Sequence, residues 1–340
     1  MIIQENISLK PYNTFGIEAS ARFFTTFQSA SQLQEILESK VYLQSNQQKL
    51  ILGGGSNILL TQDVNAWVLK NEIIGIEKIS ETAEYVYIKA GAGVQWHYLV
   101  MHCIENNWAG MENLALIPGN AGASPMQNIG AYGTEIKDIF FSLEAFHLET
   151  KTIQVFHLKD CAFGYRESVF KNTLKGQFVI LSVTYQLYKT PKFNTAYGAI
   201  EQELQRMGVN DLSIQAIAQA VINIRSSKLP DPTVIGNAGS FFKNPEISTA
   251  QFDDLKAQFP EIVGYPLPNH QVKLAAGWLI EKAGFKGYRV GDAGCHAQQA
   301  LVLVNYGNAT GNEIFQLSET IIAAVQEKFN VLLQREVNII

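Results

Sequence analysis

Cysteine is scarce in this chain of 340 residues, and its cysteines lack the spacing of a disulfide framework or a zinc site. Cys103, Cys161 and Cys295 are odd in number and contain no CxxC pair. We therefore expect buried or free thiols in a reducing compartment. His97 and His102 lie five residues apart on a predicted helix and do not share one of its faces, so we expect no metal site.

Excess positive charge is also absent, since 26 Lys and Arg stand against 31 Asp and Glu for a net charge of −5. A nucleic-acid-binding surface needs a basic face, so we expect no nucleic-acid partner. No uncharged apolar run approaches the roughly 20 residues of a membrane-spanning helix. The first residues also lack the basic and apolar segments of a signal peptide. We expect a cytoplasmic monomer without a membrane partner.

Apolar residues are plentiful instead, at 47% of the chain, and a chain of this length suffices for two or three domains. Their periodicity predicts both classes of secondary structure. Strands are predicted at 49–52, 66–70, 85–90, 139–148, 152–157, 178–187, 300–305 and 331–340. Helices are predicted at 31–38, 94–107, between 191 and 225, at 273–283, and from an N-cap at Asn312 to about 329. Two prolines in 225–232 place a domain boundary nearby.

The most unusual stretch runs from Ile117 to Glu135, and we call it the glycine loop. It has neither helical nor strand periodicity, four glycines and two prolines interrupt it, and its only charged residue is Glu135. Glycine lets a backbone approach a ligand closely because no Cβ intervenes. Loops this long are uncommon as mere connections. We interpret the glycine loop as a backbone cradle for a large cofactor carrying phosphates, and the alternative is a surface meander of turns.

A shorter glycine-rich turn, Gly53–Asn57, follows the predicted strand at 49–52. Ile58 stands where a Rossmann fingerprint has its third glycine, and no Gly-Lys-Ser/Thr follows as in a P-loop. The consecutive amides of this turn could still form an anion-binding nest. The alternative is a plain β-turn.

Three further places carry residues suited to chemistry. Arg166 follows Tyr165 in a glycine-led turn, Ser240 stands beside two phenylalanines in the segment 236–245, and Glu336 interrupts the last apolar stretch. Each has a plainer role open to it. Arg166 could form a surface ion pair with Glu167, Ser240 could be a turn serine, and Glu336 could lie on the exposed side of a strand.

Taken in chain order, these five motifs resemble the UDP-N-acetylenolpyruvoylglucosamine reductase family over nearly the whole chain. Each motif alone is weak, whereas five in this order are specific. The family makes UDP-N-acetylmuramate for bacterial peptidoglycan. The resemblance thus implies a flavoprotein oxidoreductase of cell-wall synthesis, on which cell shape and division depend.

The resemblance also implies the architecture and the cofactors. The fold class would be α+β: an FAD-binding fold of the vanillyl-alcohol-oxidase/PCMH type, made of two α+β subdomains, plus a third α+β domain that binds substrate. The implied boundaries are 1–70 with 330–340, 71–215, and 216–329. FAD would be bound non-covalently, NADPH would be the co-substrate, and the other partner would be a UDP-sugar.

The residue roles that the resemblance implies are these. Arg166, Ser240 and Glu336 match the catalytic positions. Tyr165, Tyr197, Lys228, Asn244 and Gln299 match positions that contact substrate, with Tyr197 folding over the nucleotide. The cofactor contacts would come from Gly53, Gly54, Gly55, Ser56, Asn57, Ile117, Pro118, Gly119, Gly122, Ala123, Ser124, Gln127, Asn128, Gly130, Ala131, Tyr132 and Gly133.

The chemistry of the implied reaction suits the three catalytic residues. Hydride from flavin N5 adds at C3 of an enol ether conjugated to a carboxylate, and negative charge then builds up on that carboxylate. The planar, permanently charged fork of Arg166 can grip it at two points. Ser240 would give the proton to C2. Glu336 would avoid repelling the carboxylate if it carried a proton, which burial could favour by raising its pKa.

Two other functions fit parts of the sequence. An FAD-linked oxidase would share the cofactor fold, but many such oxidases tether FAD through a histidine, and neither FAD-contacting glycine segment contains one. A non-catalytic nucleotide-binding module would need the glycine segments without Arg166, Ser240 and Glu336 together. The visible spectrum separates these hypotheses in part, since a flavoenzyme is yellow.

Overall fold

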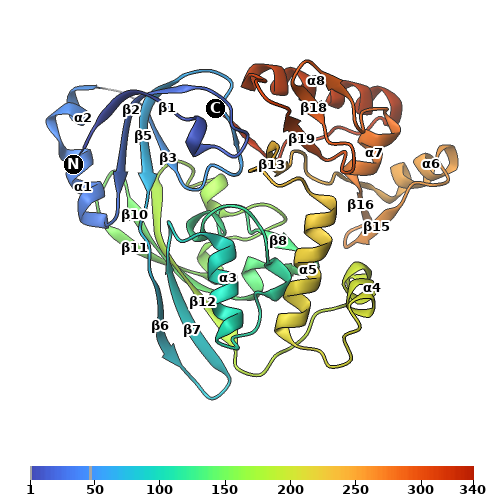
Figure 1. The fold of residues 1–340 in the computed structure, drawn as a ribbon, viewed down its shortest axis with the longest axis horizontal. Helices are drawn as coiled ribbons and strands as arrows, with labels where there is room; N and C mark the ends of the chain where they lie inside the picture. The colour runs from blue at the N-terminus through green and yellow to red at the C-terminus, as the bar shows by residue number, and fades with distance from the viewer. Residues whose placement is uncertain (1, 46–47) are drawn as a thin grey trace. The chain divides into compact units, whose positions relative to one another are not determined.

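The computed structural model describes residues 2–45 and 48–340, and the chain divides into two compact units (Figure 1). Unit 1 contains the described residues of Met1–Ile7, Ala21–Gly54 and Asn65–Ser227. Unit 2 contains Ser8–Ser20, Gly55–Val64 and Lys228–Ile340. Both units mix helices with sheets, in agreement with the predicted α+β class. The three-part division implied by the resemblance stays a prediction.

The first sheet of unit 1 has the strand order β1-β2-β5-β3, with β3 and β5 parallel. Helix α1 packs on it through Leu33, Ile36 and Leu37, which recur at the spacing of one helix face and meet Phe27 and Trp67 in one apolar cluster. The Ser29 hydroxyl caps α1. The elements are β1 (Gln4–Ser8), β2 (Ser20–Phe27), α1 (Ala30–Glu38), α2 (Lys40–Ser45), β3 (Gln48–Leu52) and β5 (Val64–Asn71).

The second sheet of unit 1 is antiparallel, in the order β11-β10-β12-β7-β6. One residue in two along β7 is buried, as the alternating sequence predicts, and Val86 and Ile88 join Leu99 and Val100 of α3 in the larger apolar core. Helix α5 packs into the same core (Figure 1). The elements are β6 (Ile76–Glu81), β7 (Tyr85–Gly91), α3 (Trp96–Glu105), β8 (Gly130–Ala131), β9 (Thr134–Glu135), β10 (Phe140–His147), β11 (Ile153–His157), β12 (Phe178–Tyr188), α4 (Gly198–Arg206) and α5 (Ile214–Lys228).

Unit 2 is built on two small sheets with the orders β13-β19-β18-β17 and β14-β16-β15, and a parallel pair of β20 with β4. Buried side chains of β19 and α8 supply much of its core, including Val302, Leu303, Ile314 and Ile321. The elements are β4 (Ile58–Leu59), β13 (Gly236–Ser240), β14 (Glu246–Ser248), α6 (Thr249–Gln258), β15 (Gly264–Leu267), β16 (Gln271–Leu274), α7 (Ala276–Lys282), β17 (Arg289–Val290), β18 (Ala293–Cys295), β19 (Val302–Asn305), α8 (Gly311–Phe329) and β20 (Asn338–Ile339).

Three predicted elements near the C-terminus are wrong in part. The helix predicted at 273–283 begins only at Ala276, because Lys273 and Leu274 pair with β14 and β15. The last helix has Thr310 rather than Asn312 as its N-cap, since Thr310 and Glu313 form a reciprocal capping box. The strand predicted at 331–340 is reduced to β20, and residues 334–336 pair only irregularly with residues 241–243.

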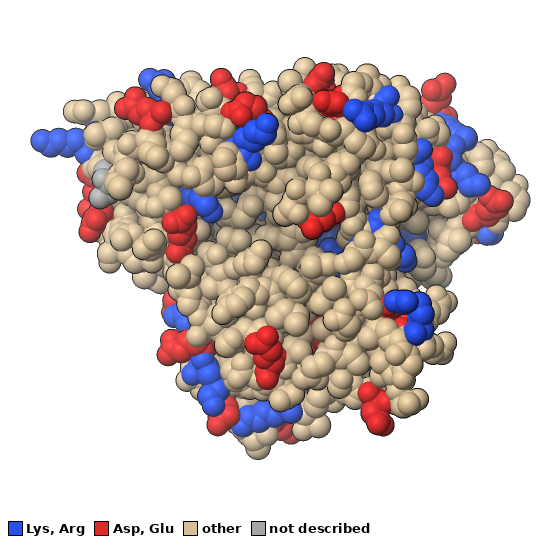
Figure 2. All heavy atoms as spheres, in the orientation of Figure 1, with Lys and Arg blue, Asp and Glu red and all other residues tan. Residues whose placement is uncertain are grey.

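Other sequence predictions can be compared directly with the described residues. All three cysteines are buried free thiols, as expected, and burial raises the pKa of each to about 12. No group of three or more His, Cys, Asp or Glu side chains suited to a metal ion occurs among residues 2–45 and 48–340. None of the helices described here is long and apolar enough to cross a membrane. Positive and negative side chains intermingle on the face drawn in Figure 2, without a continuous field of one sign.

Candidate active site

The first two residues of the Gly53–Asn57 turn belong to unit 1, where Gly54 packs against the glycine loop. A Cβ added to Gly54 would lie 2.8 Å from Asn120 Oδ1 and 3.1 Å from Gly119 Cα. A Cβ on Gly122 would lie 2.5 Å from the Ala92 Cβ. Only glycine fits at either position, so the backbone of the predicted cradle is closely packed. That arrangement suits a ligand held by main-chain groups, which is how phosphates are commonly bound.

The middle of the glycine loop is held by a buried hydroxyl. After a short turn of 3₁₀ helix at Ala121–Ala123, the Ser124 Oγ donates to Ala121 O at 2.7 Å and lies 2.9 Å from the Tyr185 hydroxyl. Ser124 is almost completely buried. Its side chain therefore shapes the loop, and its assignment as a cofactor contact stays a prediction.

Arg166 occupies a strained turn that reaches back to the glycine loop. Gly164 and Glu167 exchange backbone hydrogen bonds of 3.0 and 3.3 Å around Tyr165 and Arg166. The backbone of Arg166 is left-handed, with φ of 56°. Its Nη2 donates to Gly130 O at 2.9 Å, and its guanidinium carbon lies 5.6 Å from the Tyr165 ring centroid. The structure therefore brings three of the predicted site residues together.

Left-handed backbone conformations concentrate around this part of unit 1. Eleven non-glycine residues with positive φ occur in the described chain, and four of them lie in or next to the glycine loop and the Arg166 turn: Leu116, Asn128, Tyr132 and Arg166. Such conformations persist only where the surroundings enforce them, and they are enriched at functional sites. The concentration supports the glycine loop and the Arg166 turn as the functional region of unit 1.

Arg225 is a site residue that the sequence analysis missed. Its Nε donates to Leu116 O at 3.2 Å, while the Leu116 amide donates to His97 Nδ1 at 3.0 Å. Burial lowers the pKa of Arg225, the Tyr132 phenol opposes that shift, and the Arg166 guanidinium adds to it. The structure thus keeps two cations near one another. The missed signal is that Arg225 follows Val221 at a spacing of four residues and so continues the buried face of α5.

Burial and the charge of Arg225 both lower the pKa of His97. A lower pKa favours the neutral imidazole near pH 7, and only a neutral ring has a nitrogen that can accept the Leu116 N–H. His97 and Arg225 therefore bind the N–H and the C=O of Leu116, respectively. Leu116 immediately precedes the glycine loop, and its φ is 58°.

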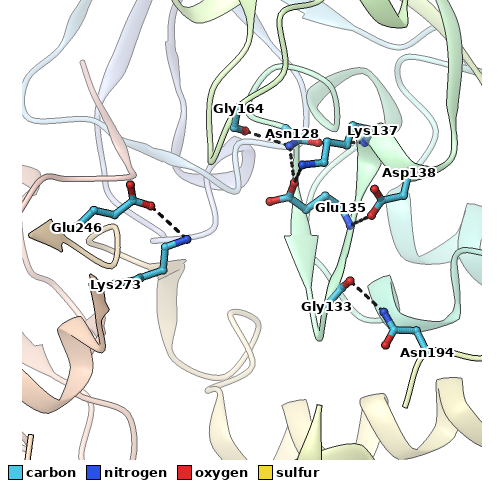
Figure 3. Close-up of polar contacts among 9 residues, drawn as sticks. All are labelled: Asn128, Gly133, Glu135, Lys137, Asp138, Gly164, Asn194, Glu246 and Lys273. Atoms are coloured by element: carbon cyan, nitrogen blue, oxygen red, sulfur yellow. Dashed lines mark hydrogen bonds and ion pairs between the residues drawn. The ribbon is translucent and has the colours of Figure 1, made fainter. Parts of the chain in front are cut away.

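The segment that carries Tyr197 is attached to the tip of the glycine loop (Figure 3). Asn194 donates from Nδ2 to Gly133 O at 3.0 Å, and the buried Asn113 donates from its own Nδ2 to Tyr132 O and Asn194 O, each at 2.9 Å. Tyr197 itself is 53% exposed, and its ring meets the Tyr132 ring edge to face at 5.4 Å. An exposed aromatic ring anchored at its base is available to stack on a ligand.

Unit 2 gathers the other predicted catalytic residues around Gly236–Pro245, which we call the phenylalanine loop. Ser240 ends β13, and the next amide, that of Phe241, donates to Leu301 O at 2.8 Å. The Glu336 amide donates to Phe241 O at 2.8 Å, and Asn57 Nδ2 donates to Glu336 O at 3.3 Å. The structure therefore places Ser240, Glu336 and Asn57 on neighbouring segments of unit 2.

Two of the predicted substrate contacts meet at the start of α7 in unit 2. Asn244 Oδ1 accepts a hydrogen bond from the Ala276 amide at 3.0 Å. Gln299 Oε1 lies 3.1 Å from the position that a Cβ on Gly277 would take. Lys228, the last residue of α5, is exposed. The roles of all three in binding substrate stay predictions.

Comparison with known proteins gives the family. Residues 231–340 match the family model of the UDP-N-acetylenolpyruvoylglucosamine reductase C-terminal domain, and residues 21–155 match that of an FAD binding domain. A UDP-N-acetylenolpyruvoylglucosamine reductase of Flavobacterium johnsoniae is 50% identical over 341 residues, covering 100% of both chains. One of Pseudomonas putida is 47% identical and covers 99% of this chain and 98% of its own.

A solved structure supports the fold. The crystal structure of UDP-N-acetylenolpyruvylglucosamine reductase from Thermus caldophilus matches 99% of both chains with a TM-score of 0.70, at 23% sequence identity. Likeness at this identity speaks for the shared α+β fold. The FAD binding domain model adds that the first half of the chain has the architecture expected of a flavoprotein.

Proposed function

Because the chain belongs to the UDP-N-acetylenolpyruvoylglucosamine reductase family, we propose that it makes UDP-N-acetylmuramate for peptidoglycan. It is an FAD-dependent oxidoreductase that uses NADPH to reduce the enolpyruvyl group of a UDP-sugar. The single observation that carries the assignment of residues is the contact between the Arg166 guanidinium and the glycine loop, at 2.9 Å from Gly130 O. It joins a permanent cation to the segment that we propose as the cofactor cradle.

The residues of the cradle fit FAD. No side chain fits at Gly54 or Gly122, so other parts of the chain approach the backbone closely there, and main-chain groups in such segments suit a pyrophosphate. We propose that the turn Gly53–Asn57 and the glycine loop hold FAD without a covalent bond. FAD held there would supply the redox chemistry of the reaction, namely transfer of hydride from NADPH to the enolpyruvyl group.

Arg166 is proposed to hold the substrate carboxylate. Its planar fork can donate to both carboxylate oxygens, and it keeps its charge while negative charge develops there. The left-handed backbone and the bond to Gly130 O fix the base and one nitrogen of this side chain. Donors set in place before reaction need no reorganisation as charge builds up.

Ser240 is proposed to deliver the proton to C2, with Glu336 as a partner residue. The serine lies at the end of β13, next to Phe241 and Phe242, which are 0% and 1% exposed. The two buried rings leave little room for water among the residues that follow the serine, which favours proton delivery by the protein. A protonated Glu336 would donate a hydrogen bond without repelling the substrate carboxylate.

The UDP portion is proposed to contact Tyr165, Tyr197, Lys228, Asn244 and Gln299. Tyr197 offers an exposed aromatic face, and Lys228 offers an exposed cation suited to phosphate.

We further propose a cytoplasmic monomer without nucleic-acid or membrane partners. NADPH and nucleotide sugars are cytoplasmic metabolites, and the net charge of −5 disfavours binding to a polyanion.

The proposal is tested with Ser240→Ala and stopped-flow measurement of the two half-reactions. The purified protein should be yellow and release intact FAD on heating. Ser240→Ala should still be reduced by NADPH at a nearly normal rate, whereas reoxidation by the enolpyruvyl nucleotide should slow by roughly 10²–10⁴-fold, as expected for loss of a general acid.

Ser248→Ala is the matched control. This serine lies in the same unit but caps α6 by accepting a hydrogen bond from the Gln251 amide at 3.2 Å. The Ser248→Ala variant should lose some stability and keep normal rates in both half-reactions. A Ser240→Ala variant that reoxidises at the wild-type rate would remove Ser240 from the mechanism, and a protein that stays colourless after addition of FAD would overturn the function.

A further inference from the structure

Asn128 is a buried polar side chain of the glycine loop whose amide group is fully hydrogen-bonded (Figure 3). Its Nδ2 donates to Glu135 Oε2 and to Gly164 O, each at 3.0 Å, and its Oδ1 accepts from the Lys137 amide at 3.0 Å. The residue is 0% exposed. Both N–H groups and the carbonyl of one side chain are therefore used inside the protein. A buried amide satisfied in this way fixes the segments that it joins.

The segments that Asn128 joins are those that place Arg166. Gly164 opens the four-residue turn that carries Arg166, and the carbonyl that binds Asn128 belongs to this glycine. The Arg166 guanidinium in turn donates to Gly130 O, two residues after Asn128. The turn and the guanidinium of Arg166 are thus both fixed to the same short stretch of the glycine loop.

We propose that Asn128 is a positioning residue that sets the place of Arg166 through Gly164. The inference rests on the proposed function, in which Arg166 holds the substrate carboxylate. A second tie exists, from Ser168 Oγ to Met126 O at 2.6 Å, but it lies beyond the turn rather than at its start. Without Asn128 the hydrogen bonds from Lys171 Nζ to Arg166 O, at 3.3 Å, and from Arg166 to Gly130 O remain, but neither is made by the residue that starts the turn. Loss of Asn128 therefore frees the start of the turn at Gly164, and we expect Arg166 to shift relative to Gly130.

The chemistry of the site requires an amide at position 128. Aspartate has the same shape, but it would set an acceptor against the Glu135 carboxylate and the Gly164 carbonyl where donors are needed. Alanine would remove the amide that donates to Glu135 and Gly164. It would also strain the backbone, because φ is 44° at this residue. Glycine removes the amide without that strain, so Asn128→Gly is the cleanest variant.

The experiment measures both half-reactions of the FAD-loaded enzyme in Asn128→Gly, Arg166→Ala and the double variant. We expect Asn128→Gly to slow reoxidation by the enolpyruvyl nucleotide by on the order of 10²-fold, the loss typical of a displacement near 1 Å. NADPH-driven reduction should slow less than reoxidation does, because the Asn128 side chain is buried and bonded within the protein, which leaves only its backbone for a contact with FAD. Because Asn128 acts through Arg166, the double variant should be no slower than Arg166→Ala alone.

Asn71→Ala is the matched control for loss of a buried amide. Asn71 is 5% exposed in the same unit, where it donates to Ile180 O at 2.9 Å and accepts from the Ile73 amide at 3.1 Å. It should lower the unfolding midpoint about as much as Asn128→Gly and leave both half-reactions near wild type. A crystal structure of Asn128→Gly should show the turn at 164–167 displaced, which gives a readout apart from activity.

The outcomes separate this inference from the proposed function. If Arg166→Ala reoxidises normally, the proposed role of Arg166 fails. If Arg166→Ala is slow but Asn128→Gly is not, or if the two effects multiply in the double variant, Asn128 does not act through Arg166. If Asn128→Gly fails to fold, Asn128→Ser replaces it in the comparison of single and double variants. The same slowing of reoxidation is expected, and the same outcomes would contradict the inference.

Discussion

The glycine loop of unit 1 and the phenylalanine loop of unit 2 hold their shapes by different forces. The glycine loop buries two polar side chains, Ser124 and Asn128, whose hydrogen bonds join segments that do not form a regular sheet. The phenylalanine loop buries Phe241 and Phe242 and is pinned by backbone bonds to neighbouring segments. The glycine loop is thus held mainly by side-chain hydrogen bonds, whereas the phenylalanine loop adds the packing of two buried rings to its hydrogen bonds, which include those of the buried Asn237.

The difference shows which interactions fix the geometry of this enzyme and which supply its stability. Hydrogen bonds contribute little net stability each but fix geometry, whereas a buried aromatic ring contributes much stability with less directional control. Removal of a hydrogen-bonding side chain from the glycine loop should therefore disturb chemistry more than stability. Substitutions of the apolar residues in the phenylalanine loop should do the reverse. Phe241→Ala and Gly122→Ala test that contrast within the two loops, and Asn113→Ala and His97→Gln test side chains that bond to the glycine loop or to the residue before it.

Phe241→Ala should have the largest effect on stability. Phe241 is 0% exposed and packs edge to face on Phe15 at 6.2 Å and on Phe242 at 5.2 Å. We expect a loss of about 3–5 kcal/mol in the free energy of unfolding, measured with urea. Phe141→Ala, at a ring that is 39% exposed, is the control and should cost much less. Equal losses would show that Phe241 is not a core residue.

Gly122→Ala should have the next largest effect, because the glycine loop tolerates no added volume there. The new methyl group would lie 2.5 Å from the Ala92 Cβ and 3.0 Å from its Cα. Forcing such atoms apart costs about 1–3 kcal/mol, measurable in the same urea titration. Gly198→Ala, where nothing lies within 4 Å of the added Cβ, is the control and should be neutral or slightly stabilising. A neutral Gly122→Ala would argue against the close backbone approach.

Asn113→Ala should have a smaller effect on stability and a specific effect on the Tyr197 segment. Two hydrogen bonds of 2.9 Å, to Tyr132 O and Asn194 O, would be lost. At the usual net value of a hydrogen bond, the expected cost is about 1–2 kcal/mol. Hydrogen exchange should rise at residues 194–197 and stay unchanged in β7. Asn106→Ala, at an exposed helix end, is the control. Unchanged exchange at 194–197 would mean that Asn113 does not anchor this segment.

The smallest effect should come from pH, through His97. Its folded-state pKa lies below the ordinary value of 6.5, because of burial and then the charge of Arg225. The unfolded state then binds more protons between the two pKa values, so stability is present above about pH 6.5 and falls as pH is lowered from there. The unfolding temperature, followed from pH 7.5 to 5.5, should fall less in His97→Gln than in the wild type.

His296 offers the comparison for that measurement. Burial lowers its pKa in unit 2 as well, so His296→Gln should also flatten the pH dependence. The effect at His97 should be the larger, since protonation there also breaks the 3.0 Å bond from the Leu116 amide and sets two cations together. If His296→Gln has the greater effect, the bond to Leu116 is not a stabilising contact.

Much of the fold was predictable because it depends on local periodicity. The alternation at 85–90 and the apolar spacing at 31–38 correspond to β7 and α1. Predictions failed where neighbours in space overrode the local pattern. The local pattern at Lys273 and Leu274 predicts a helix, but these residues pair with strands β14 and β15. Asn312 has the right chemistry for an N-cap, but Thr310 takes that position because Glu313 completes its capping box.

By itself, the sequence determined which segments are unusual: two glycine-rich stretches, a cation in a glycine-led turn, and a serine beside two phenylalanines. These are statements about residue chemistry, which composition and order carry directly. Only the tertiary structure decided that Asn128 bonds to Gly164, that Arg225 faces Leu116, and that the Glu336 amide meets Phe241 O. Those contacts join residues 36, 109 and 95 positions apart in the chain, and no local pattern encodes which distant carbonyl a buried donor will find.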